Sequence, residues 1–112
     1  MNYKKQEFED GEIEIFMFPN KREITLVTHK CLGKYHTEIG WNFNTTRKTA
    51  FCDILNSHYT TYFDAKLKPI KELYNSLKKQ KNKTKEIKLL ITALMIINHE
   101  IKNQQFEQLS LF

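Results

Sequence analysis

Acid–base side chains occur at two places where their spacing permits proton transfer. His36 and Glu38 are two residues apart in an alternating stretch, so both lie on one face of the expected strand. Asp53 and His58 are about one turn apart on an expected helix. A nuclease site gathers several carboxylates around a divalent ion. Here the acids gather instead in residues 7–14, an N-terminal segment expected to be exposed, so we expect the chain not to be an enzyme.

The sequence gives equally weak indications of a metal site and of a catalytic nucleophile. The His29-x-Cys31 pair lacks the Cys-x-x-Cys spacing of a structural zinc site, and the remaining histidines and Cys52 are scattered. With only three glycines there is no phosphate-binding loop, and no nucleophile motif is present. We therefore expect no metal and no other cofactor. The two cysteines are expected to be small buried hydrophobes in a reducing compartment rather than a disulfide.

Positive charge is concentrated in the second half of the chain. Residues 66–88 hold nine lysines against Glu72 and Glu86, whereas residues 7–14 hold five acids and no base. Lysines that follow a DNA backbone release counterions, which gives weak, salt-sensitive and sequence-independent binding. The lysines expected to do this are Lys78, Lys79, Lys81, Lys83 and Lys85. The alternative is a solubilising surface between two helices.

The last five residues, Gln108-Leu109-Ser110-Leu111-Phe112, alternate polar and apolar side chains in a way that suits a hydrophobic cleft. At all five positions they resemble the Gln-Leu-Ser/Asp-Leu-Phe motif with which many bacterial DNA-replication and repair proteins bind the sliding clamp. The resemblance covers five of 112 residues, and residues 1–107, expected to form one α+β domain, resemble no family we recognise.

The resemblance implies a role for each residue of this peptide. Gln108 would place its amide against the rim of the clamp cleft, and Ser110 would face solvent. Leu109 and the Leu111–Phe112 pair would fill two hydrophobic depressions. The alternative is that these three apolar side chains end a helix and pack into the protein's own core.

Together these features predict a small, non-enzymatic accessory or inhibitory protein of DNA replication that docks on the bacterial sliding clamp. A protein in that cleft either recruits a factor or blocks other clients, as a phage- or plasmid-encoded inhibitor would. One alternative is a nucleic-acid-binding module that uses the lysines. Another is an inhibitor of a different host or defence protein, in which residues 7–14 mimic nucleic-acid charge or extend a partner's sheet.

Composition limits the chain to one small folded domain of 112 residues, because a 40% hydrophobic and 12% aromatic share is too high for a disordered chain. The longest apolar run, residues 89–97, is about half the length that crosses a bilayer. No membrane association is therefore expected. No secretion signal opens the sequence, so we expect a cytoplasmic protein.

The first half of the chain has the period-two pattern of strands. Strands are expected over residues 12–17, 23–29 and 35–43, with turns at residues 19–21 and 33–34. In the first strand, Ile13, Ile15 and Met17 alternate with Glu12, Glu14 and Phe16. Tyr35, Trp41 and Phe43 share one face of the third strand, where we expect core packing rather than a stacking platform for unpaired bases.

The second half changes to helical spacing. One helix is expected after Thr45 or Thr46, through Phe51 to Phe63, and a second follows Pro69 in its first turn. A third begins at Thr84 and buries Ile87 to Ile101. The predicted class is α+β, in the order β-β-β-α-α-α, with the helices covering a three-stranded antiparallel meander. The last helix would present the terminal peptide.

Overall fold

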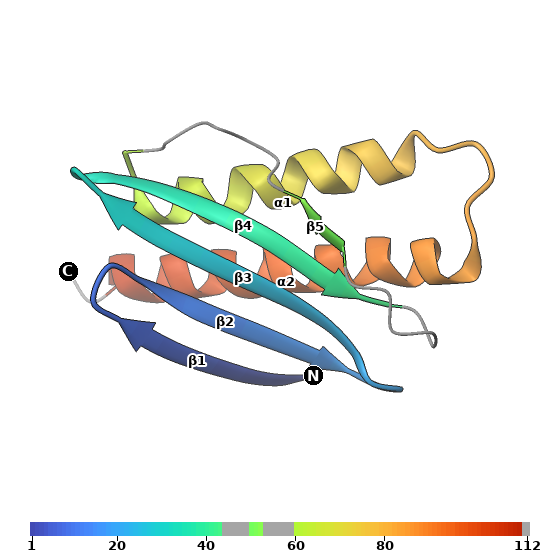
Figure 1. Ribbon diagram of the computed structural model, residues 1–112, viewed down its shortest axis with the longest axis horizontal. Helices are drawn as coiled ribbons and strands as arrows, with labels where there is room; N and C mark the ends of the chain where they lie inside the picture. The colour runs from blue at the N-terminus through green and yellow to red at the C-terminus, as the bar shows by residue number, and fades with distance from the viewer. Residues whose placement is uncertain (44–49, 53–59, 111–112) are drawn as a thin grey trace.

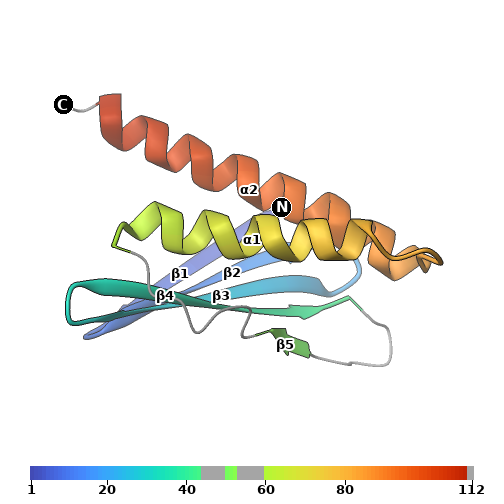
Figure 2. The ribbon, with the colours of Figure 1, turned by 90° about the horizontal axis from the view of Figure 1, so that it is seen from above.

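Two helices lie on one face of an antiparallel sheet whose strands are arranged in chain order (Figures 1 and 2). This structure, a computed structural model, describes residues 1–43, 50–52 and 60–110, with the backbone alone for residues 50–52, 109 and 110. The elements are β1 (Asn2–Phe8), β2 (Gly11–Phe18), β3 (Arg22–Cys31), β4 (Lys34–Asn42), β5 (Ala50–Cys52), α1 (Tyr62–Lys78) and α2 (Lys85–Ser110).

The α+β class is confirmed, but the predicted order of three strands and three helices is wrong. Within the described ranges, four long strands and one short strand precede two helices. The first missed strand, β1, consists of seven exposed residues that pair with β2, so it shows no alternation of apolar and polar side chains. The second, β5, has only three residues and pairs with β4, where Ile39 lies opposite Cys52.

The helix predicted after Thr45 or Thr46 is also wrong, because Ala50–Cys52 forms a strand. The remainder of that prediction, including Ile54, Leu55 and Tyr59, lies outside the described residues. Helix α1 begins only at Tyr62 and continues through Pro69, which was expected in a first turn. Proline lacks the N–H group that would bond to the preceding turn. Helix α1 nevertheless continues past the buried Pro69 and ends at Lys78.

The face of β2 that lies under the helices is the one that carries two carboxylates. Glu12, Glu14 and Phe16 are buried, whereas the alternate residues Ile13 and Ile15 are only half-buried on the opposite face. Strand register explains this choice, because Phe16 lies opposite Ile24 on β3, and Ile24 lies opposite Trp41 on β4. The apolar row across the three strands therefore fixes the orientation of β2, and the two glutamates are buried with it.

The core fills the space between this sheet face and the helices. From the sheet it contains Phe16, Ile24, Leu26, Ile39 and Phe43; from α1, Ile70, Leu73 and Leu77; from α2, Leu90, Ala93, Leu94, Ile97 and Ile101. Trp41 packs against this cluster, which supports core packing rather than a stacking platform for the face that also carries Phe43. Tyr35 is half-buried at the end of that face, with its ring centroid 5.8 Å from that of Tyr62.

Helix α2 begins as predicted and is the longest element. The side chain of Thr84 accepts a hydrogen bond from the backbone N–H of Ile87 at 3.2 Å, which caps the first turn. The helix then runs for 26 residues. Its C-terminal end lies farther from the sheet than its N-terminal end (Figure 2). Within the described part of the chain, no helix is long and apolar enough to cross a membrane.

Candidate functional site

The C-terminal end of α2 carries the clamp-binding-like peptide beyond Ile101, the last buried residue among the described side chains of the helix. Ile101 is fully buried, whereas Phe106 is 72% exposed and Gln108 is also exposed. The helix includes the backbone of Leu109 and Ser110, so it continues into the first three positions of the peptide. The side chains of Leu109 and Ser110, together with all of Leu111 and Phe112, lie outside the described part of the structure.

A helical conformation would not present the three apolar side chains of the peptide together. Each residue of an α-helix turns by about 100°, so Leu109 and Leu111 would point to nearly opposite sides. The last turn has no basic side chain and contains Glu107, whose charge interacts unfavourably with the negative end of the helix dipole. In a helical conformation the three apolar side chains would therefore not enter one cleft together.

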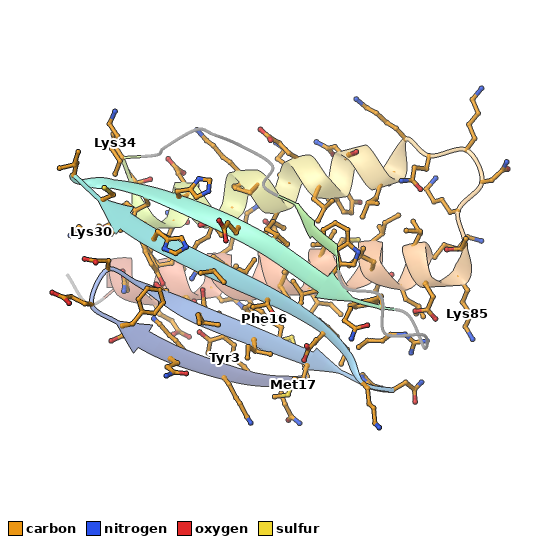
Figure 3. The ribbon with its side chains drawn as sticks, in the orientation of Figure 1. Tyr3, Phe16, Met17, Lys30, Lys34 and Lys85 are labelled. Atoms are coloured by element: carbon orange, nitrogen blue, oxygen red, sulfur yellow. The ribbon has the colours of Figure 1, made fainter. Side chains whose placement is uncertain are left out.

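The predicted DNA-contacting lysines lie at the opposite end of the molecule, around the connection from α1 to α2 (Figure 3, near Lys85). Four of them, Lys78, Lys79, Lys81 and Lys85, are exposed, and Lys83 is half-buried. The ammonium group of Lys83 donates a hydrogen bond to the carbonyl of Gln80 at 2.8 Å, which holds the connection in a compact turn.

Glu86, which follows Lys85 in the sequence, is neutralised by an ion pair with an arginine. Arg22, at the start of β3, donates to both carboxylate oxygens of Glu86 at 2.8 and 3.0 Å. These hydrogen bonds lower the pKa of Glu86 and raise that of Arg22. The neighbouring lysines are thus left with a surplus of positive charge.

A buried polar network occupies the other end of the sheet, where sequence analysis placed only exposed acids. That expectation is wrong for Glu12 and Glu14, because α1 covers them. The two carboxylate oxygens of Glu14 contact the ammonium of Lys66 at 2.5 Å and the hydroxyl of Tyr3 at 2.6 Å. Lys66 also donates to the hydroxyl of Tyr62 at 3.0 Å, and both partners of the ion pair are fully buried.

The surroundings of this network keep its two tyrosines protonated. Burial raises the pKa of Tyr3, and a hydrogen bond to Glu14 raises it further. Burial likewise raises the pKa of Tyr62, followed by its hydrogen bond to Glu12. The ammonium of Lys5 lies 3.3 Å from the carboxylate of Glu12, so it offsets that negative charge at the edge of the network. The ammonium of Lys66 is also 4.5 Å from the centre of the Tyr62 ring, a cation–π distance.

This arrangement attaches α1 to the sheet but does not form an open reaction centre. Glu14 and Lys66 have no exposed side-chain surface, so neither can touch a substrate in this conformation. The pairing of Glu14 with Lys66 was not predicted because Lys66 lies in a lysine-rich stretch. A signal was nevertheless present, since Lys66 precedes Ile70 and Leu73 by four and seven residues and therefore lies on the buried stripe of α1.

The other predicted acid–base groups lie on β4 or outside the described residues. His36 lies opposite His29 on the sheet face away from the helices, and Glu38 is half-buried on the same strand. Asp53 and His58 lie outside the described residues. Cys31 is an exposed free thiol, which corrects its expected burial. In residues 1–43, 50–52 and 60–110, no three histidine, cysteine or acidic side chains are grouped as metal ligands.

The inhibitor alternative requires an exposed sheet edge beside residues 7–14, and β1 forms that edge instead of β2. The strand expected to offer that edge, β2, is paired on both sides, with β1 and with β3. The edge on this side of the sheet is β1, which carries Lys4 and Lys5 among its seven exposed residues. Lysines on an edge strand disfavour the addition of another strand.

Comparison of the chain with protein-family models, characterised proteins and solved structures yields no match.

Proposed function

We propose that the protein is a non-enzymatic accessory or inhibitory factor that docks on the bacterial DNA sliding clamp through Gln108 to Phe112. The five-residue match to the clamp-binding motif carries this proposal. The exposure of Phe106 and Gln108, which follow the buried Ile101 on α2, supports it, because the described residues directly before Leu109 do not belong to the core.

Docking couples to unwinding of the last turn of α2. Gln108 occupies the rim of the cleft, and the apolar side chains of Leu109, Leu111 and Phe112 transfer from water into two depressions. Burial of a leucine or phenylalanine side chain contributes about 1.5–3 kcal/mol, which is well above the cost of releasing one exposed helical turn. A protein bound in this way occupies the cleft that other clients need, so recruitment and inhibition both follow from the same contact.

Titration of purified bacterial sliding clamp with the full chain tests the proposal. Deletion of residues 108–112, and the double substitution Leu111→Ala/Phe112→Ala, should abolish measurable binding. Two matched controls should bind as the wild type does: Ser110→Ala, at the solvent-facing position of the motif, and Phe106→Ala, an exposed aromatic residue just before it. An unchanged affinity after the deletion would end the proposal.

A second candidate function is binding of a nucleic-acid backbone at the lysine end. The observation that favours it is the pairing of Glu86 with Arg22, which leaves Lys78, Lys79, Lys81 and Lys85 as an exposed cationic surface. Binding to duplex DNA should weaken steeply with salt, with a slope of about 0.9 for each phosphate neutralised. Replacement of Lys79, Lys81 and Lys85 by glutamine should reduce that slope, and a slope near zero for the wild type would reject this function.

A further inference from the structure

A groove of about 640 Å³ lies between α1 and α2 and belongs to neither candidate site described above. Its apolar surface is provided by Leu67, Ile70 and Tyr74 from α1 and by Leu94 and Met95 from α2. Ile70 and Leu94 are buried at the bottom, whereas Met95 is 54% exposed.

The borders of this groove are basic. Lys68 and Lys71 line it from α1, and His99 and Lys102 line it from α2. No aspartate or glutamate is among the lining residues. The lining therefore combines an apolar floor with lysine side chains at its borders, which is the complement of a segment that has an apolar face flanked by carboxylates.

The dimensions of the groove fit a short helix. The lining extends from Leu67 to Asn75 on α1 and from Leu94 to Lys102 on α2, which is about 12 Å along each axis. About two turns of a third helix span that distance. An apolar stripe at every third and fourth residue would reach the floor, and acidic residues beside the stripe would lie at the lysines.

We propose that this groove is a docking site for an acidic amphipathic helical segment of a partner protein. The apolar floor distinguishes this occupant from a nucleic acid, whose phosphates gain nothing from contact with Leu67, Leu94 or Met95. The site is separate from the C-terminal peptide. It can bind a partner whether or not Gln108 to Phe112 contact the sliding clamp.

The test measures fluorescence anisotropy of a labelled synthetic peptide that has leucines at helical spacing and glutamates at its remaining positions. A second peptide keeps the leucines and replaces every glutamate by lysine. A short DNA duplex serves as the competing class of ligand. The full-length protein is used as wild type, as Met95→Asp, as Lys71→Glu/Lys102→Glu, and as the matched control Lys30→Glu/Lys34→Glu, which makes the same charge change at two exposed lysines outside the groove and outside the lysine connection.

We expect the acidic peptide to bind the wild type and the control alike, and to bind each groove variant at least about tenfold more weakly. Equal binding of the lysine peptide, or an equal loss in the control, would overturn the proposal because it would indicate unspecific attraction. DNA binding that depends on Lys71 and Lys102, with no binding of the peptide, would also overturn the proposal. Absence of acidic-peptide binding up to about 1 mM would overturn it as well. Far-ultraviolet circular dichroism verifies that each variant is folded.

Discussion

At the scale of single residues, the most consequential contact is the buried pair of Glu14 and Lys66. Both charged side chains are fully buried, so their mutual attraction and the hydrogen bonds with two tyrosine hydroxyls must offset a large desolvation cost. A well-packed apolar pair of similar volume would not carry that cost. We expect the network to fix where α1 lies on the sheet more than it adds to stability, because a shift of the helix would separate the two buried charges.

Removal of one partner from this pair should be far more damaging than removal of both. We expect Lys66→Met to lower the free energy of unfolding by about 3–5 kcal/mol, because it leaves the carboxylate of Glu14 buried without its cation. The double variant Glu14→Leu/Lys66→Met should recover most of that loss. Urea denaturation followed by circular dichroism measures both. A single variant that costs less than about 1 kcal/mol would show that the pair is hydrated in solution.

The two tyrosines of the network should make the fold sensitive to alkali. Burial raises the pKa of Tyr3 and of Tyr62 in the folded state above the value of about 10 in the unfolded chain. Below pH 10 both states keep the protons and this contribution to stability is complete. Above pH 10 the unfolded state loses its protons first, so stability falls as the pH approaches the folded-state values.

The alkaline loss should therefore be smaller in variants that lack these hydroxyls. Comparison of urea midpoints between pH 9 and pH 11 for the wild type, Tyr3→Phe and Tyr62→Phe measures it. Phenylalanine does not titrate, so each variant should show a shallower decline than the wild type. An identical decline in all three proteins would mean that the tyrosines are not protected by the network.

At the scale of secondary-structure elements, the strong periodic patterns were predictable and the weak ones were not. Strands β2, β3 and β4 and helix α2 follow patterns long enough to identify from sequence. Strand β1 has no buried residue, and β5 is too short to show any period. Helix α1 was misplaced because Pro69 indicates a helix start, whereas the helix begins seven residues earlier, at Tyr62.

The orientation of β2 and the position of the candidate sites depended on tertiary contacts. An alternation of isoleucine with glutamate identifies a strand, but the row formed by Phe16, Ile24 and Trp41 decides which side faces the helices. Sequence spacing located the terminal peptide and the lysines. It did not locate the groove, whose two sides come from α1 and α2 and meet only in the folded chain.

Helix α2 should have two parts of different stability. The turns up to Ile101 pack in the core, whereas the turns beyond it carry the exposed Phe106 and Gln108. We expect amide hydrogen exchange to show strong protection through about Ile101 and a steep loss of protection toward Ser110. Deletion of residues 108–112 should leave the urea midpoint unchanged. Protection at residues 107–110 equal to that at Leu94 would contradict the release of this turn on which clamp docking depends.

At the scale of the whole molecule, the two proposed contact surfaces are separated along the longest dimension, 42 Å, of an elongated domain. The lysines near Lys85 lie at one end and Lys30 and Lys34 at the other (Figure 3). Helix α2, which is 26 residues or about 39 Å long, runs from Lys85 in the lysine connection into the first three positions of the terminal peptide. One rigid element thus holds the two candidate contact surfaces apart.

This separation predicts that the two surfaces act independently. The distance exceeds the Debye length of about 8 Å at physiological salt several-fold, so a charge change at one end is screened from the other. Deletion of residues 108–112 should abolish clamp binding and change DNA affinity by less than about threefold. Substitution of Lys79, Lys81 and Lys85 by glutamine should do the reverse. Separate titrations of each variant with clamp and with duplex DNA measure the four affinities. A loss of both activities in either variant, with the circular dichroism spectrum unchanged, would show that the ends are coupled through α2 and would contradict independent action.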